Sequence, residues 1–401
     1  MFRIKVLFLS VLTVFVVSAQ HSSVDEFSKY PFVNVQEISV NNDSTLIQFF
    51  SKLEKLQKNE LNSKINIVHI GDSHVQGDFL TGEIRKLFQL NFGNGGRGLI
   101  FPYRLANSYE SNDFHSASDN LWSRAALISS KRLFEPGLSG LSIRPIDSKA
   151  SLSFTTNNHD SLDYSFDKVK LICRNINSAP VHTSFSDSKS NINKSLLVEN
   201  ENSYDVELGT STNQIRFTTN NKLTIDGFVL EKNQPGILYH VIGVTGAHFA
   251  NYSRAPVFFE QLSLLKPDII IISQGTNEGV NTSITKAGLI TQIEKMVHNI
   301  QHLNPGVPVV LVTPFDSYFK KNTFNKYLGI VRSAILEVSQ RNELSCIDAY
   351  QITGGWGSAK FWRKHILLRP DGIHYTKQGY VLQGEIIYRA FINSYLKYAT
   401  H

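Results

Sequence analysis

Apolar positions along the chain follow two rhythms, and the change between them divides the sequence. In residues 46–104 and 236–401, short apolar runs alternate with segments in which apolar residues recur every three or four positions. These patterns predict buried strands and amphipathic helices, respectively. Strands are expected at 64–70, 236–243, 268–273, 307–312 and 343–349. Helices are expected at 46–56, 77–90, 258–265, 284–303, 322–341 and 376–398. Such alternation predicts a mostly parallel sheet with helices on both faces.

The segment between these two parts, residues 105–235, has a different pattern. Ser, Asn, Asp and Thr are dense, helical periodicity is lost, and short runs of alternating apolar and polar residues appear instead. Turn-forming residues separate runs that begin at 141, 151, 169, 204, 215 and 223. Strands at this spacing predict an all-β sandwich. We therefore expect one α/β domain, formed by 20–104 and 236–401, that is interrupted by a β-rich insertion.

The first 19 residues have the pattern of a signal peptide. Arg3 and Lys5 precede an apolar run at 6–17, and the small residues Ser18 and Ala19 stand where a signal peptidase cuts. The run is short for the hydrocarbon layer of about 30 Å that a membrane anchor must cross, so cleavage is favoured over anchoring. We expect an exported protein, periplasmic or secreted, with no stable membrane insertion after cleavage.

Charge and cysteine content narrow the choice of function only slightly. The formal charge is +6, from 40 Lys and Arg against 34 Asp and Glu, and no block of basic residues is present. Nucleic-acid binding therefore has little support. The two cysteines, Cys173 and Cys346, form neither a disulfide framework nor a zinc site of paired C-x-x-C type. Pairing after export and two buried free thiols both remain compatible with the sequence.

A serine motif follows the strand expected at 64–70. The residues at 71–74 are Gly-Asp-Ser-His, so Ser73 comes just past the carboxyl end of a strand, where open α/β sheets place their active sites. Gly71 allows a tight turn, and the start of the next helix favours negative charge that develops nearby. Taken alone, the motif also fits an ordinary turn.

Three further polar motifs follow strands or precede the last helix of the α/β domain. Asp371 and His374 lie three positions apart on one loop, and a hydroxyl nucleophile needs such a base with an orienting acid. Asn277 comes soon after the strand at 268–273, where a side-chain amide can donate to an oxyanion. Gly246 follows another strand and lets a backbone N–H approach a ligand closely. Each motif alone also fits a turn or a helix cap.

Together and in this order, the four motifs resemble the sequence blocks of the SGNH (GDSL-like) hydrolase superfamily. The resemblance implies a flavodoxin-like three-layer α/β/α sandwich and a serine esterase that needs neither a metal nor an organic cofactor. It implies that Ser73 is the nucleophile, His374 the general base and acid, and Asp371 the residue that orients the histidine. His74 departs from the family pattern, because many members have Leu there.

The same resemblance implies an oxyanion hole. Its donors would be the N–H groups of Ser73 and Gly246 and the side chain of Asn277, with Gly243 as the alternative glycine of the second block. Glu278 departs from the family pattern, because many members have Asp at that position. Neither departure removes a residue of the implied mechanism.

Two further features resemble the peptidoglycan O-acetylesterases that carry an inserted carbohydrate-binding-like β-sandwich. One is the glycine-rich stretch at 92–98, which Phe-Pro-Tyr follows at 101–103, and the other is the β-rich insertion itself. This resemblance implies removal of acetyl groups from an acetylated polysaccharide, most naturally peptidoglycan, through an acetyl-Ser73 intermediate. The alternatives are an acetylesterase for plant or other glycans, an O-acetyltransferase with the same triad, and a glycan-binding protein with an inactive esterase domain.

Three other motifs fit their usual functions poorly. Gly-x-Gly-x-x-Gly at 93–98 matches a dinucleotide fingerprint, but it follows a predicted helix and opens none. The G-x-S-x-G elbow of α/β-hydrolases is absent. Glu294, His298 and His302 share one predicted helix but lack the H-E-x-x-H order of zinc peptidases, so a solvated helix face is favoured.

Overall fold

The computed structural model describes residues 27–158, 162–176, 180–199, 201–320 and 322–400. The expected signal peptide therefore lies outside the described residues. Within the described part of the chain, no helix combines the length and the apolar character needed to cross a membrane. Cys173 and Cys346 are both buried free thiols, which settles the alternative that the sequence left open.

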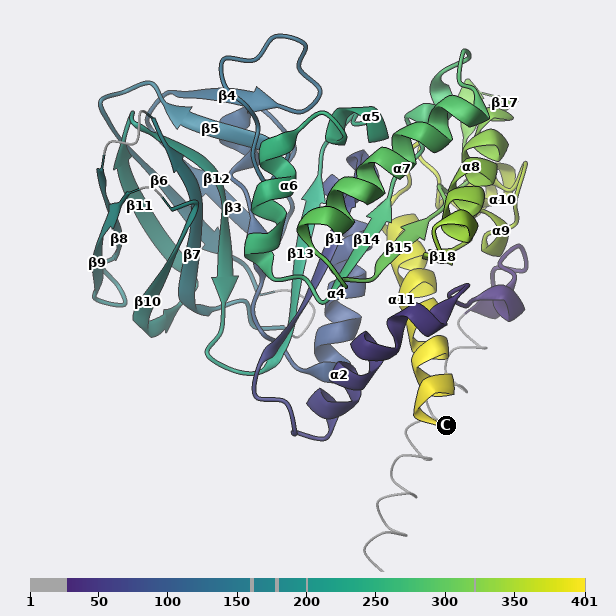
Figure 1. Cartoon of the computed structure of the whole chain (residues 1–401), viewed down its shortest axis with the longest axis horizontal. Helices are drawn as coiled ribbons and strands as arrows, with labels where there is room; N and C mark the ends of the chain where they lie inside the picture. The colour runs from purple at the N-terminus through teal and green to yellow at the C-terminus, as the bar shows by residue number, and fades with distance from the viewer. Residues whose placement is uncertain (1–26, 159–161, 177–179, 200, 321, 401) are drawn as a thin grey trace, which may run out of the picture.

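A five-stranded parallel sheet forms the centre of the hydrolase part (Figure 1). In spatial order its strands are β13 (Gly236–Gly243), β1 (Lys64–Gly71), β14 (Ile269–Ser273), β15 (Val309–Val312) and β18 (Ser345–Ile347). Parallel sheets are buried on both faces, which explains the continuous Ile and Val runs. Along β1, Ile65 and Ile67 enter the core on one side of the sheet, whereas Val68 and Ile70 enter the core on the other.

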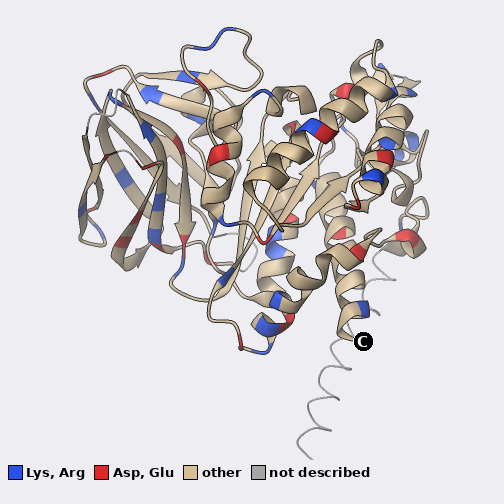
Figure 2. Ribbon diagram, in the orientation of Figure 1, with Lys and Arg blue, Asp and Glu red and all other residues tan. Residues whose placement is uncertain are grey.

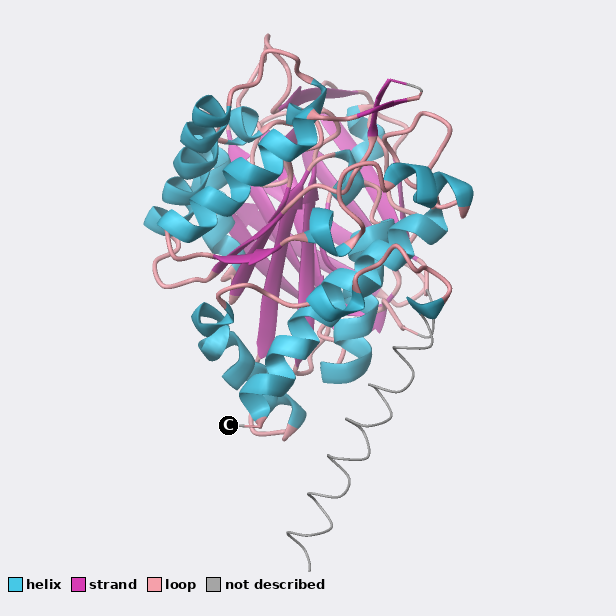
Figure 3. Ribbon diagram, turned by 90° about the vertical axis from the view of Figure 1, so that its right-hand side faces the viewer, coloured by secondary structure: helices cyan, strands magenta, loops and turns pink. Residues whose placement is uncertain are grey.

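Helices cover both faces of this sheet (Figure 3). One core contains residues of α2 (Ile47–Gln57), α4 (Phe79–Phe92) and α11 (Lys377–Ala399). The opposite core contains residues of α6 (Pro256–Leu262), α7 (Lys286–Leu303) and α8 (Tyr327–Arg341). The three-layer α/β arrangement predicted from the sequence is thus confirmed.

The helices predicted at 77–90 and 322–341 begin later than expected. The first begins only at Phe79, as α4; a separate short helix, α3 (Ser73–Gln76), precedes it, and Asp78 between them has a left-handed backbone, φ 55°. The helix predicted from 322 begins only at Tyr327, as α8. A short hairpin of β16 (Tyr318–Lys320) and β17 (Thr323–Phe324) precedes it.

The β-rich part forms two antiparallel sheets that pack face to face. One sheet contains β4 (Trp122–Ala126), β5 (Leu141–Pro145), β7 (Phe166–Asn175), β10 (Ser203–Thr212) and β12 (Leu223–Glu231), with β2 (Gly98–Ile100) paired to β12. The other contains β3 (Phe114–Ala117), β6 (Lys149–Thr156), β8 (Val181–Asp187), β9 (Ile192–Val198) and β11 (Gln214–Asn220). Phe228 of the first sheet contacts Phe154 and Phe217 of the second. The two sheets therefore share an aromatic core, as in a sandwich.

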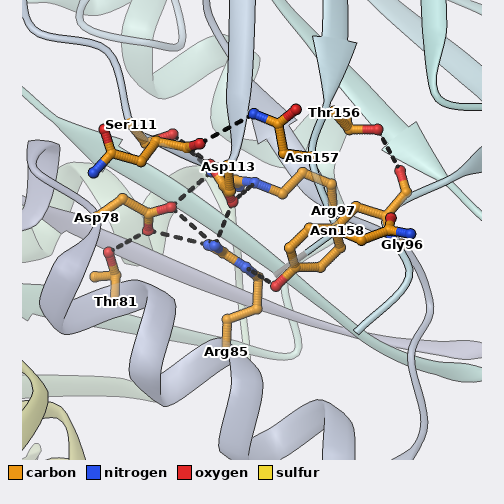
Figure 4. Close-up of polar contacts among 12 residues, drawn as sticks. Asp78, Thr81, Arg85, Gly96, Arg97, Ser111, Asp113, Thr156, Asn157 and Asn158 are labelled. Carbon is orange, nitrogen blue, oxygen red and sulfur yellow. Dashed lines mark hydrogen bonds and ion pairs between the residues drawn. The ribbon is translucent and has the colours of Figure 1, made fainter. Parts of the chain in front are cut away.

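A buried ion network joins the sandwich to α4 (Figure 4). Arg85 donates to Asp78 at 2.9 Å and to Asp113 at 2.7 Å, and Arg97 donates to the same two carboxylates at 2.7 and 3.0 Å. Both arginines are only 2% exposed. Burial alone would raise the pKa of Asp113, but Arg97 and Arg85 outweigh it and hold that pKa below its ordinary range. The positive charges of the two arginines thus balance the negative charges of the two aspartates inside the protein.

Candidate active site

Ser73, His374 and Asp371 form a continuous hydrogen-bonded chain. Ser73 Oγ lies 3.0 Å from His374 Nε2, and His374 Nδ1 lies 3.1 Å from Asp371 Oδ2. The other oxygen of Asp371 accepts the backbone N–H groups of Ile373 and His374, at 2.8 and 2.9 Å. Partial burial acts to raise the pKa of Asp371. The two backbone bonds and the neighbouring imidazole outweigh this effect, so the pKa of Asp371 lies below its ordinary value. The arrangement has the hydroxyl, base and orienting acid of a serine hydrolase.

The local sequence positions Ser73 at the end of β1. A side chain at Gly71 would put its Cβ 2.4 Å from Ser273 O, so only glycine fits between β1 and β14. Asp72 caps α3, because its side chain accepts the N–H of His74 at 2.9 Å. Parallel register places Gly71 beside Gly243 of β13 and Ser273 of β14. The loops that follow the three strands therefore emerge at the same edge of the sheet.

The two candidate glycines of the second block differ in their surroundings. Gly243 packs against α3, and an added Cβ would lie 2.2 Å from the backbone nitrogen of Gln76. Gly246 has a φ of 79° and nothing within 4 Å of the position of a Cβ. Gly243 is therefore required for packing, whereas Gly246 borders open space that a ligand could enter.

Asn277 connects the loops of the first and second blocks. Its side-chain nitrogen donates to the carbonyl of Ala247 at 2.9 Å and lies 3.4 Å from Asp72 Oδ2. These contacts hold the amide between the Ser73 loop and the Gly246 loop and engage both of its hydrogens, so donation to an oxyanion would require one of the two bonds to be released.

Two buried carboxyl groups lie behind these loops. Burial raises the pKa of Asp72 to about 7, and burial together with the charge of Asp72 raises the pKa of Glu278 to about 8. Glu278 accepts the N–H of Phe249 at 2.7 Å and so holds the start of α5 (Phe249–Tyr252). Glu278, which stands where many family members have Asp, thus has a structural contact of its own.

Gln76, in the first block, has contacts that the sequence did not reveal. Gln76 is buried; its side-chain oxygen accepts the N–H and hydroxyl of Thr245, both at 2.7 Å. Its amide nitrogen donates to Ser108 Oγ at 2.7 Å and to Tyr109 O at 2.8 Å. Gln76 therefore positions the second-block loop against the segment that leads into the sandwich. The only signal in the sequence is its place three residues after Ser73.

His74 stacks against the proposed base. Its ring lies 5.2 Å from that of His374 with an interplanar angle of 27°, and its Nδ1 lies 3.0 Å from the hydroxyl of Tyr380. Burial, helped by His374, lowers the pKa of His74 to about 3, so its ring is neutral at ordinary pH. His74 thus supports His374 sterically without adding a charge.

The candidate zinc helix lacks the geometry of a metal site. The rings of His298 and His302 stack in parallel along α7, 6.2 Å apart. Throughout the part of the chain that the structure describes, no three His, Cys, Asp or Glu side chains are grouped to hold a metal ion.

A family model for the GDSL-like lipase/acylhydrolase family matches residues 228–382. The matched segment includes Gly246, Asn277, Asp371 and His374, and the structure brings Ser73 to His374 from outside it. The chain carries a GDSL-like acylhydrolase domain. The protein is accordingly an SGNH-type carboxylic ester hydrolase.

Solved structures extend the likeness beyond this domain. A peptidoglycan O-acetylesterase superposes with a TM-score of 0.74 at 20% sequence identity, covering 90% of this chain and 99% of that one. The acylhydrolase and that protein therefore share a fold, and the shared part extends into the sandwich. A family two carbohydrate esterase from Cellvibrio japonicus matches with a TM-score of only 0.29 at 11% identity, over 70% of this chain and 98% of that one. A search of curated proteins with the sequence finds no match.

Proposed function

We propose that the acylhydrolase is an exported acetylesterase that removes O-acetyl groups from a polysaccharide, with peptidoglycan as its substrate. The observation that carries the proposal is the chain of contacts from Ser73 Oγ through His374 to Asp371. The peptidoglycan assignment is supported by the fold shared with a peptidoglycan O-acetylesterase. Export is supported by the signal-peptide pattern of the first 19 residues.

The proposed reaction begins when Ser73 Oγ attacks the acetyl carbonyl carbon and His374 Nε2 accepts the hydroxyl proton. The oxyanion is stabilised by the N–H groups of Ser73 and Gly246 and by the side chain of Asn277. When the tetrahedral intermediate collapses, the C–O bond to the sugar breaks and the departing sugar oxygen takes the proton from His374. Asp371 holds the imidazole in its productive orientation and stabilises its charged form.

The second half of the reaction regenerates the serine. Water attacks the carbonyl of acetyl-Ser73 and gives a proton to His374, and collapse releases acetate while the proton returns to Ser73 Oγ. A sugar hydroxyl in place of this water would give an acetyltransferase. Every step uses side chains and backbone N–H groups of the chain together with water, and the mechanism requires no cofactor.

Acetate release tests the proposal. The protein without residues 1–19 is incubated with O-acetylated peptidoglycan and with acetylated xylan, beside a Ser73→Ala variant of it. We expect serine-dependent release that is faster from peptidoglycan. Faster release from xylan would retain the triad but refute the peptidoglycan assignment, and full turnover by Ser73→Ala would refute the mechanism. Acetylation of an added acceptor sugar, with no net acetate release, would favour the transferase.

A further inference from the structure

An exposed tryptophan lies on a glycine-rich loop after α9 (Ala349–Ile352). Trp356 is 64% exposed, whereas Trp362, six residues later, is fully buried. Gly354, Gly355 and Gly357 flank it with φ angles of 102°, 66° and 83°, in the left-handed region that favours glycine. The local sequence is thus built for a turn that displays the indole ring.

A short series of contacts connects this ring to the catalytic loop. The edge of Trp356 meets Phe324 with the ring centroids 5.5 Å apart, and Phe324 stacks on Tyr318 at 5.3 Å. Tyr318 donates its backbone N–H to the carbonyl of Gly372 at 2.8 Å, between Asp371 and His374. The hairpin β16–β17 therefore forms one wall that runs from the proposed base to the exposed indole.

Basic residues are frequent in the segments that contain this wall. The described residues of 318–330 and 354–377 include seven Lys or Arg and a single acid, Asp371, which is engaged with His374. Lys320 on the hairpin and Lys360 on α10 (Ala359–Lys364) are exposed, and the guanidinium of Arg363 stacks on Tyr318 at 3.9 Å. Figure 2 shows Lys and Arg positions, in blue, in the region of β17 and α10. The occupant that fits such a surface combines an apolar flat face with negative charge.

We propose that Trp356 and the β16–β17 hairpin form a subsite for a pyranose ring of an anionic glycan strand, farther along the strand than the sugar whose ester reaches Ser73. The C–H face of a pyranose packs on the indole, while carboxylates of the strand meet Lys320 and Lys360. This inference rests on the proposed function, because it assumes that the ester is carried by a polysaccharide. It gives the acylhydrolase a means of preferring a polymer over a small ester.

The test compares a polymer with a small ester. Trp356→Ala should lower kcat/KM on O-acetylated peptidoglycan about tenfold, mostly through KM, because the stacking of one ring is lost. It should leave hydrolysis of p-nitrophenyl acetate unchanged, since Trp356 does not touch the triad. Trp356→Phe should retain most of the activity on the polymer. Leu133→Ala, which alters a more exposed apolar side chain (82%) in the loop between β4 and β5, should change neither activity.

Binding separates this inference from the proposed function. Sedimentation with insoluble peptidoglycan compares Ser73→Ala with Ser73→Ala/Trp356→Ala, and it needs no acetate release. We expect the double variant to bind more weakly, and the binding of the single variant to fall with added salt. Equal binding by both proteins would overturn the subsite, whatever the enzyme does, and binding insensitive to salt would overturn its preference for an anionic strand. Absence of acetate release from every glycan, with Trp356-dependent binding intact, would refute the proposed function alone.

Discussion

Replacing Arg97 by Met should destabilise the fold strongly, because the buried network would lose one of its two cations. Asp78 and Asp113 would then share only Arg85. All four side chains are at most 9% exposed, so water cannot replace the lost guanidinium. Breaking a buried ion pair from one side typically costs about 3–5 kcal/mol. Since domains are stable by about 5–15 kcal/mol, this single change should remove a large part of the free energy of unfolding.

Urea unfolding followed by far-UV circular dichroism measures this loss. Arg341→Met is the matched control, because Arg341 pairs with Glu337 on the exposed surface of α8 and should contribute less than about 1 kcal/mol. Arg97→Met/Asp113→Asn removes one charge of each sign and should regain part of the stability. If Arg97→Met costs no more than Arg341→Met, the network is not a determinant of stability and the reasoning fails.

Two further predictions concern the loops around Ser73. Asn277→Ala should lower turnover of p-nitrophenyl acetate about 10²–10³-fold with little change in KM; steady-state kinetics check this, and a loss below tenfold would exclude Asn277 as an oxyanion donor. The folded protein retains protons on Glu278 (pKa about 8) and Asp72 (about 7) that the unfolded chain loses near pH 4. Between pH 4 and pH 8, the free energy of unfolding should therefore be greatest near pH 4 and fall as the pH rises towards about 8. The melting temperature of Glu278→Gln, which mimics the protonated acid, should fall less steeply with rising pH than that of the unchanged protein. An unchanged slope would contradict the raised pKa of Glu278.

The sequence predicted the central sheet and the members of the candidate site because both depend on short stretches of chain. Each strand of the parallel sheet is a continuous apolar run, since both of its faces are buried. Polar motifs that follow such runs must emerge at the carboxyl edge of one sheet. The register of Gly71 with Gly243 and Ser273 shows this directly. The contact between Ser73 and His374, 301 positions apart, is different, because His374 lies on the loop between α10 and α11 and does not directly follow a strand.

The departures from prediction occur where distant residues decide the local backbone. The helix predicted from 77 begins only at Phe79, after Asp78, whose backbone turns to φ 55° and whose carboxylate pairs with Arg97. The hairpin at 318–324 interrupts a segment whose apolar spacing also fits a helix. The strand β2 has only three residues and is held by β12, far along the chain. Local periodicity contains no information about these partners.

The same argument explains why the reacting groups can be recognised from the sequence more readily than the residues that position loops or that are proposed to select a substrate. A serine, a histidine and an acid are recognisable because few side chains can perform proton transfer and nucleophilic attack. Gln76 and Trp356 are recognisable only through what surrounds them: one is a buried amide with four hydrogen bonds, the other an indole that the fold leaves uncovered. Either residue in an isolated sequence fits a solvated helix or a core equally well. Under the proposed function, the substrate selectivity of this acylhydrolase is therefore expected to depend on the loops and the hairpin around the proposed triad.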